Sequence, residues 1–331
     1  MKVAVVGCGA LGSFYGAKLC RAGVPVHFLL RSDYQTVLRH GVQILSPETE
    51  FRVFPHSACR PDEVGPCDLV IVALKTTANQ SLSTLLPPLV GTRSWILTLQ
   101  NGLGNEEALA ALFGPDRILG GLCFVCLNRI APGVIRHSAH GQIVLGQHLQ
   151  PPTEGARSVA ALFIQAGIPC DLTPDLACAH WEKLVWNIPF NGLGVAGIAG
   201  WNNVLRGRRP QVLDRTTTLA TDELLRDPHW AALVRELMDE VVASGRQAGF
   251  PIAADLPQRM IERTRCMGAY RASTLLDFER GMPLELDSLF VEPLRRARTT
   301  GVPTPRLEAL CAILAQLDRH KSCCAPQTDG L

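Results

Sequence analysis

The first residues of the chain indicate phosphate binding. The apolar run of residues 3–6 is followed directly by the glycine-rich loop Gly7-Cys8-Gly9-Ala10-Leu11-Gly12. Strand, glycine turn and helix in this order are what a dinucleotide-binding βαβ unit requires, with Gly9 against the pyrophosphate and Gly12 where helix packs on strand. The first N–H groups of such a helix have no partner within the helix, so they and the helix dipole can hold phosphates. We therefore expect this loop to bind a dinucleotide.

The residue after the second expected strand, residues 24–30, indicates which dinucleotide. An NAD-binding chain carries Asp or Glu near this position for the ribose 2′-hydroxyl, whereas Arg31 suits a 2′-phosphate. Ser32 can add a hydroxyl donor. Asp33 argues the other way, since an acid two residues later could bend back toward the ribose. The sequence favours NADP, with an ordinary solvated surface charge as the alternative for Arg31.

Polar residues also follow two expected core strands, residues 69–74 and 95–99. Lys75 comes directly after the first strand, and Asn101 follows closely after the second. Ligands bind beyond the carboxyl ends of parallel strands, so Lys75 could neutralise a phosphate or a carboxylate, and Asn101 could bind the nicotinamide ribose. Each alone is equally compatible with a loop side chain facing water. Together they favour binding, and we predict both as cofactor-binding residues.

A polar stripe interrupts an apolar helix in the second half of the chain. Lys183, Asn187 and Asn191 are spaced by four residues, so each step drifts only about 40° around an α-helix. Such a stripe either faces solvent or lines a wet cleft. The two asparagines cost helix stability, and Pro189 should also kink the helix. Local violations of this kind are expected at functional sites, so we favour the cleft.

Two later residues are weaker candidates. Glu285 lies between apolar neighbours, which makes it either a partner for a lysine in a cleft or an exposed helix residue. Ser273, twelve residues earlier, indicates little by itself.

The elements that position these residues change in type along the chain. Strands alternate with helices up to about residue 172, and after Pro174 the pattern is helical. We predict an N-terminal Rossmann-type, doubly wound α/β domain over residues 1–172 and an all-α domain over residues 173–318, with the ligand cleft between them. Residues 319–331 are expected to form a disordered tail.

Several further elements are expected from local patterns. Short strands are predicted at residues 42–45 and 51–53, and two later ones at 133–135 and 142–146, joined by a polar turn. Helices are predicted over residues 229–245 and from Pro305 toward Leu317.

Composition limits the classes of function. The 331 residues are 47% hydrophobic and carry a formal charge of +2, which gives no reason to expect nucleic acid or an anionic membrane as partner. No apolar run reaches the roughly 18 residues that span a bilayer, and the early strand leaves no room for a signal peptide. We expect a cytoplasmic protein that acts on a small molecule, and a homodimer is left open.

The cysteines are numerous but scattered. Most of the twelve lie among apolar neighbours, and the pair Cys123 and Cys126 has no second pair at zinc-site spacing. We expect reduced, buried thiols and no metal.

Taken in order, these residues resemble the ketopantoate reductase (2-dehydropantoate 2-reductase) family over residues 1–318. That family opens with GxGAxG and has an arginine after the second strand, a lysine after the fourth core strand and Asn-Gly after the fifth. Its catalytic helix reads K-x-x-x-N-x-x-x-N, and a serine is followed twelve residues later by a glutamate. The matching residues here are Gly7 to Gly12, Arg31, Lys75, Asn101-Gly102, Lys183, Asn187, Asn191, Ser273 and Glu285.

The resemblance implies NADPH-dependent reduction of a 2-oxo acid to a 2-hydroxy acid, with ketopantoate to pantoate, in pantothenate and coenzyme A biosynthesis, as the type reaction. Lys183 would be the catalytic acid, and Glu285 would be its catalytic partner that holds it in place. The substrate's carboxylate and hydroxyl groups would be bound by Asn187, Asn191 and Ser273. The helical domain would be of the kind found in 6-phosphogluconate dehydrogenases.

The sequence departs from the family pattern near the expected substrate site. Leu276 replaces a glutamine, and Phe190 is bulkier than in many relatives. A related reductase of another bulky 2-oxo acid is therefore an alternative. A non-catalytic NADP-binding sensor is a second alternative, against which the presence of Lys183 and Glu285 argues.

Overall fold

The chain folds into two compact units. In the computed structural model, which describes residues 1–324, these units are Met1–Ala179 and His180–Leu331. The division therefore comes after Ala179 rather than after residue 172. The reason is Leu176, at the start of helix α6 (Leu176–Ala196), which lies directly against Gly120 and Gly146 of the first unit's sheet.

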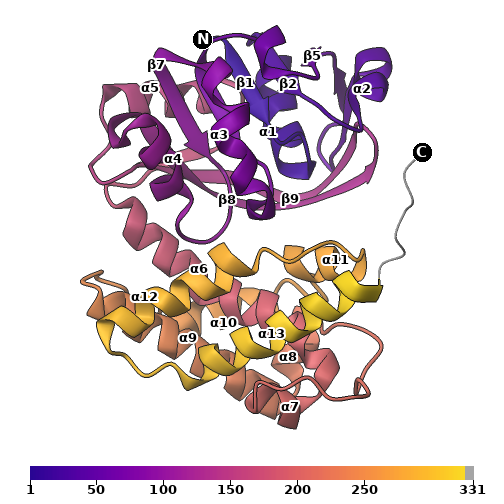
Figure 1. Cartoon of the computed structure of the whole chain (residues 1–331), viewed down its shortest axis with the longest axis vertical. Coiled ribbons are helices and arrows are strands. Elements are labelled where there is room, and N and C mark those ends of the chain that lie inside the picture. Colours follow the sequence, from indigo (N-terminus) through magenta and orange to yellow (C-terminus); the bar gives the residue numbers. More distant parts are fainter. Residues whose placement is uncertain (325–331) are drawn as a thin grey trace. The chain divides into compact units, whose positions relative to one another are not determined.

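The first unit is built on a mixed sheet in the order β4-β3-β9-β8-β7-β6-β1-β2-β5, with β10 beside β9 (Figure 1). Strands β2, β1, β6, β7 and β8 are parallel neighbours, whereas β8 pairs with β9, and β3 with β4, in antiparallel fashion. The strands are β1 (Val3–Val6), β2 (Val26–Leu29), β3 (Val42–Leu45), β4 (Phe51–Val53), β5 (His56–Ala58), β6 (Cys67–Val72), β7 (Val90–Thr98), β8 (Ile118–Ala131), β9 (Val134–Gln147) and β10 (Cys170–Leu172).

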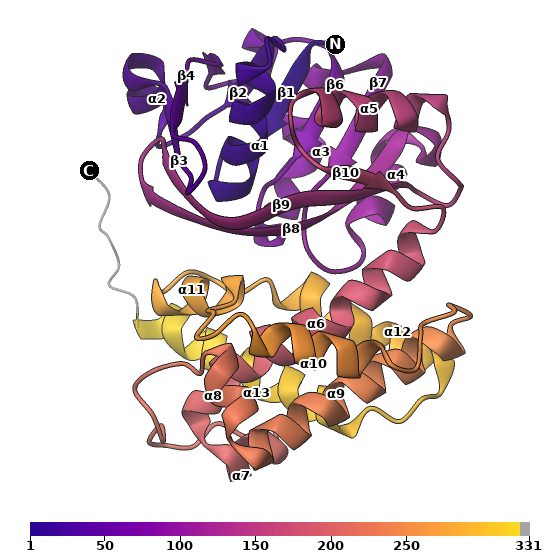
Figure 2. The ribbon, with the colours of Figure 1, turned by 180° about the vertical axis from the view of Figure 1, so that it is seen from behind.

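Both faces of this sheet are covered. Along β1, Val3 and Val5 belong to one buried cluster with residues of α1 and α5, while Ala4 and Val6 belong to another with residues of α3 and α4. Figure 2 shows α1 and α5 beside the strands. The helices of this unit are α1 (Ala10–Arg21), α2 (Tyr34–His40), α3 (Leu82–Leu85), α4 (Asn105–Phe113) and α5 (Glu154–Gln165). The predicted doubly wound α/β class is confirmed.

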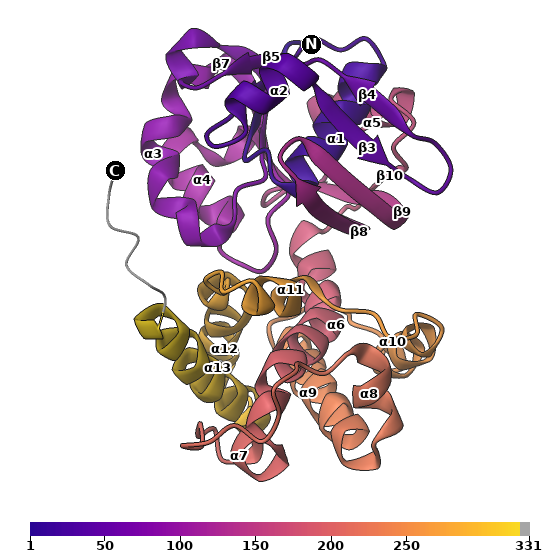
Figure 3. The same ribbon diagram turned by 90° about the vertical axis from the view of Figure 1, so that its right-hand side faces the viewer.

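The sheet is strongly curled. Strands β4 and β5 stand at opposite ends of the strand order, yet only Phe54 and Pro55 separate them in the chain. Three Cα steps span at most about 11 Å, so the two edges of the sheet come close together. Figure 3 shows β3 and β4 beside the long β8–β9 pair that forms part of this curl.

One strand prediction was wrong. The stretches 133–135 and 142–146 are not two strands joined by a turn, because β9 runs continuously from Val134 to Gln147 against β8. The polar residues between them form a bulge: Phe124 pairs with Gln142 and Val125 with His140, which leaves Gly141 over. Positive φ angles of 64° at His140 and 134° at Gly141 accompany it. The strands predicted at 42–45 and 51–53 are confirmed, and the structure pairs them in antiparallel fashion.

The second unit is helical. Its elements are the rest of α6, α7 (Trp201–Leu205), α8 (Thr221–Arg226), α9 (Pro228–Gln247), α10 (Leu256–Arg265), α11 (Ser273–Glu279), a π-helical turn (Asp287–Val291), α12 (Glu292–Thr300) and α13 (Pro305–Cys324). Helix α9 confirms the helix predicted at 229–245. Helix α13 continues to Cys324, so the tail predicted from residue 319 was wrong for residues 319–324, where the helix simply propagates; the remainder, 325–331, lies outside the described residues.

The cysteines whose side chains are described are free thiols. They are not all buried as expected: Cys59 and Cys266 are exposed, whereas burial raises the pKa of the Cys311 thiol to about 12. Within residues 1–319, His, Cys, Asp and Glu side chains form no group of three that could hold a metal ion. Of the helices in the described part of the chain, none is both long and apolar enough to span a bilayer.

Candidate active site

The glycine-rich loop has the geometry that a dinucleotide requires. Gly7 has a φ of +100°, and a Cβ there would lie 2.3 Å from the backbone nitrogen of Leu74. A Cβ on Gly12 would lie 2.3 Å from the carbonyl oxygen of Gly7, so both positions exclude side chains. At Gly9 a Cβ would meet nothing within 4 Å. The two outer glycines thus serve the fold, and Gly9 leaves open space where a pyrophosphate would approach the backbone.

The N-terminus of α1 is suited to an anion. Gly9 is its N-cap, no side chain of the described protein caps the helix, and its first turn holds no acidic residue. Cys8 contributes only its backbone to this loop, because its Sγ lies 3.5 Å from the Val5 carbonyl oxygen and burial raises the pKa of the thiol far above its ordinary value. These residues fit the pyrophosphate of a dinucleotide.

The charged residues in the loop after β2 lie in different environments. Arg31 and Ser32 are exposed, whereas Asp33 is buried. The Asp33 carboxylate forms an ion pair with Arg129 of β8 and accepts a hydrogen bond of 3.2 Å from the Gly133 N–H. Asp33, the acid that argued against NADP, therefore already has partners within the protein.

The loops that carry Lys75 and Asn101 are joined by amide side chains that the sequence analysis missed. Gln100 donates from Nε2 to the Leu74 carbonyl oxygen at 2.9 Å and to Asn79 Oδ1 at 2.8 Å. Asn105 donates to the Asn101 carbonyl oxygen at 3.1 Å. Lys75 and Asn101 directly follow Leu74 and Gln100, so this network holds both at the same edge of the sheet. The signal available in the sequence was the presence of amide residues in both loops, Asn79 in the first and Gln100 and Asn105 in the second.

In the second unit, the polar stripe of α6 does not face solvent. Asn187 is 8% exposed and Asn191 is 2% exposed. Asn191 donates from Nδ2 to the Asn187 carbonyl oxygen at 3.0 Å, and its Oδ1 accepts from the Thr274 N–H at 3.1 Å and lies 3.5 Å from Ser273 Oγ. The structure therefore brings Asn191 and Ser273 together. The helix is continuous through Pro189.

Lys183 and Glu285 also belong to the second unit. Lys183 is half-buried one turn before Asn187, and Glu285 is buried just before the π-helical turn. The neighbouring Leu284 donates its N–H to Asp318 Oδ1 at 3.1 Å, which ties the Glu285 segment to α13. That Glu285 holds Lys183 stays a prediction.

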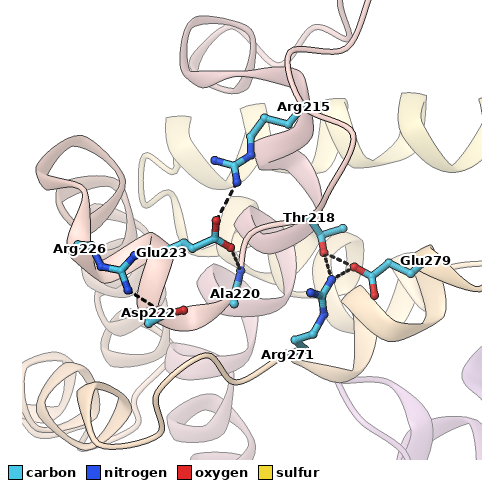
Figure 4. A network of polar contacts seen from close by, with 8 residues as sticks. All are labelled: Arg215, Thr218, Ala220, Asp222, Glu223, Arg226, Arg271 and Glu279. Carbon is cyan, nitrogen blue, oxygen red and sulfur yellow. Dashed lines mark hydrogen bonds and ion pairs between the residues drawn. The ribbon is translucent and has the colours of Figure 1, made fainter.

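A polar network fixes the helix that presents Ser273. Figure 4 shows Arg271, just before α11, pointing toward Thr218 and toward Glu279 at the end of the same helix. Arg271 donates to Thr218 Oγ1 at 2.7 Å and forms an ion pair with Glu279, which in turn accepts from Thr218. Both ends of α11 are thereby tied to one point of the unit.

Phe190 packs within the helical core. It is 1% exposed, and its ring centroid lies 5.0 Å from that of Trp186, whose Nε1 donates to Thr264 Oγ1 at 2.9 Å. Its bulk fills the space between helices, which weakens the argument from Phe190 for a different substrate.

Comparisons with known proteins agree with this arrangement. Residues 3–150 match the family described as "Ketopantoate reductase PanE/ApbA", and residues 211–318 match its C-terminal counterpart. A curated 2-dehydropantoate 2-reductase from a Nostoc species is 40% identical over 96% of this chain and 95% of its own length. The crystal structure of 2-dehydropantoate 2-reductase from Geobacter metallireducens GS-15 superposes with a TM-score of 0.86 at 42% identity, covering 96% of this chain and 99% of that one.

A more distant likeness shows the fold alone. The ternary structure of D-mandelate dehydrogenase with NADH and anilino(oxo)acetate has a TM-score of 0.82 at 19% identity, covering 97% of this chain and 99% of that one. The family matches in both units, together with the relative that is 40% identical along nearly its whole length, show that this chain belongs to the ketopantoate reductase family.

Proposed function

We propose that this chain catalyses the NADPH-dependent reduction of 2-dehydropantoate to pantoate, a step toward pantothenate and coenzyme A. The observation that carries the proposal is the buried polar stripe of α6, in which Asn191 contacts Ser273 of α11. Buried amides in an apolar helix cost stability unless something is gained from them. Relatives named for this reaction cover nearly the whole chain.

Each residue of the proposed site has its own role in the reaction. When bound, the nicotinamide of NADPH supplies a hydride to the C2 carbonyl carbon of the substrate. Lys183 polarises the carbonyl and donates a proton from Nζ to the oxygen as negative charge develops there, so that one hydride and one proton complete the alcohol. Glu285 positions Lys183 and stabilises its charge. Asn187, Asn191 and Ser273 bind the substrate's carboxylate and hydroxyl groups and fix the face that is reduced.

The first unit holds the dinucleotide in this proposal. The backbone of the loop from Gly7 to Gly12 binds the pyrophosphate, and Arg31 binds the 2′-phosphate. Lys75 and Asn101, at the edge of the sheet, contact the remainder of the cofactor. We place the reaction in the cytoplasm, since the described cysteines are free thiols, as in a reducing compartment.

Steady-state oxidation of NADPH and of NADH with 2-dehydropantoate and a panel of bulkier 2-oxo acids tests the function. We expect turnover of 2-dehydropantoate with NADPH, and for Lys183→Ala a loss of kcat of about 10²- to 10⁴-fold, as removal of a positioned general acid produces. Lys18→Ala, which removes an amine bound to the Gly167 carbonyl oxygen in the first unit, is the control and should keep kcat.

The substrate panel separates the alternatives. Preference for a bulkier 2-oxo acid would replace 2-dehydropantoate as the substrate, for which Leu276 in place of a glutamine is the feature to examine. Tight binding of NADPH with no turnover of any acid would contradict the proposed activity and indicate a sensor.

A further inference from the structure

Asp33 is a buried acid beside the expected cofactor site that the proposed mechanism does not use. It is 6% exposed and follows Arg31 by two residues. Its carboxylate contacts three donors: Arg129 Nη2, the Gly133 N–H at 3.2 Å and Ser32 Oγ at 3.1 Å. Three donors hold this carboxylate in one orientation.

Two of these donors come from the tip of the β8–β9 pair. Arg129 lies near the end of β8, and Gly133 lies in the two-residue turn before β9, where it has a φ of +67°. This tip therefore binds the loop between β2 and α2. The loop itself is closed by a hydrogen bond of 3.2 Å from the Tyr34 N–H to the Arg31 carbonyl oxygen.

The Asp33 carboxylate is also close enough to the glycine-rich loop to act on it. Burial is the main cause of the raised pKa of the Cys8 thiol, and the negative charge of Asp33 adds to it. An uncompensated negative charge at Asp33 would therefore repel a phosphate bound at this edge of the sheet. In a partly buried setting, where water screens charges poorly, one unit charge changes the binding of a nearby phosphate substantially.

We propose that Arg129 is a specificity-determining residue, which neutralises Asp33 so that Arg31 meets a 2′-phosphate without an opposing acid. This inference rests on the proposed function and extends it to cofactor choice. Without Arg129, the Asp33 carboxylate repels the 2′-phosphate of NADPH. The carboxylate oxygen that Arg129 held can then accept a hydrogen bond from a ribose hydroxyl of NADH, so the affinities of the two dinucleotides move in opposite directions.

The test measures the dissociation constants of NADPH and NADH by calorimetry on the full-length chain. Arg129→Met should lower the preference for NADPH on the order of tenfold, and the double variant Asp33→Asn/Arg129→Met should restore it. Asp33→Asn alone should keep or increase the preference, because it removes the acid and leaves the arginine. Arg136→Met, which removes an exposed arginine from the same strand pair, is the matched control and should change nothing.

Three results would overturn the inference. One is an Arg129→Met chain with the wild-type preference, and another is a double variant that stays as unselective as Arg129→Met. The third is a loss of the NADPH preference in Asp33→Asn, which would mean that the ion pair anchors the loop rather than balancing its charge. The Asp33→Asn result tests the inference even if Arg129→Met does not fold. Turnover of 2-dehydropantoate by the wild-type chain tests the proposed function separately from these binding ratios.

Discussion

At the scale of single residues, Asn191 is the most buried member of the polar stripe on α6. Its side chain satisfies the Thr274 N–H and the Asn187 carbonyl oxygen from a position that is 2% exposed. Asn191→Leu would leave that N–H buried without its acceptor. We expect the free energy of unfolding to fall by about 1–3 kcal/mol. KM for 2-dehydropantoate should rise, and the KM for NADPH should not.

Urea unfolding and steady-state kinetics check this prediction. Asn203→Leu is the control, because Asn203 also donates from Nδ2 to the carbonyl oxygen four residues earlier, that of Ala199 at 2.8 Å, but belongs to α7 and not to the polar stripe of α6. An Asn191→Leu chain that is destabilised with an unchanged substrate KM would make Asn191 a purely structural residue.

The sequence predicted which side chains share a helix face better than it predicted what those side chains contact. The four-residue spacing placed Asn187 and Asn191 on one helix face, which is a local property of the helix. Asn191, however, contacts α11, which lies about eighty residues away in the chain, and no local pattern indicates that contact. Asp33 illustrates the same limit, since its ion pair with Arg129 joins residues that only the folded sheet brings together.

At the scale of elements, strands and helices with a regular sequence pattern were predicted correctly, whereas the irregular strand β9 was not. The unbroken apolar run at 69–74 and the helical period at 229–245 each follow from one simple repeat, and both correspond to β6 and α9. The polar residues in the middle of β9 looked like a turn because a bulge and a turn use the same residue types. Pairing with β8 over its full length decided between them.

Helix α12 permits a prediction of pH dependence. Glu292, in its first turn, accepts hydrogen bonds from Arg295 at 2.6 Å and from Arg296 at 2.7 Å. These bonds, those from Arg295 above all, lower the pKa of Glu292 from its ordinary 4.5, although burial opposes them. The folded chain thus binds fewer protons here than the unfolded chain, and the stabilisation is present above pH 4.5 and is lost as the pH falls through the lowered folded pKa.

We therefore expect Glu292→Gln to lower the free energy of unfolding by about 1 kcal/mol at pH 7. The difference from wild type should shrink as the pH falls below 4.5. Urea unfolding across this range measures it. Asp239→Asn, which breaks a more exposed ion pair with Arg235, is the control and should have a smaller effect. A difference that is constant with pH would show that packing, and not charge, is what the substitution removes.

At the scale of the whole molecule, the chain consists of two compact units, each of which buries its own apolar residues. The first unit's core surrounds β1 and β6, directly behind the glycine-rich loop, while α9 contributes Leu237, Met238 and Val241 to the core of the second. A ligand that binds only the folded form of one unit stabilises that unit by mass action. In the proposed function, NADPH is such a ligand for the first unit.

Native-state hydrogen exchange with and without NADPH tests whether the two cores unfold separately. At a hundredfold excess over Kd, the slowest amides of β1 and β6 should gain about 2.7 kcal/mol of protection, which corresponds to roughly 100-fold slower exchange. Those of α9 should change little if each unit opens independently, as separate cores favour. Equal slowing in β6 and α9 would instead mean that the units unfold as one cooperative body. Slowing confined to α9 would contradict the assignment of the dinucleotide to the first unit, and NADH at the same concentration provides the comparison ligand.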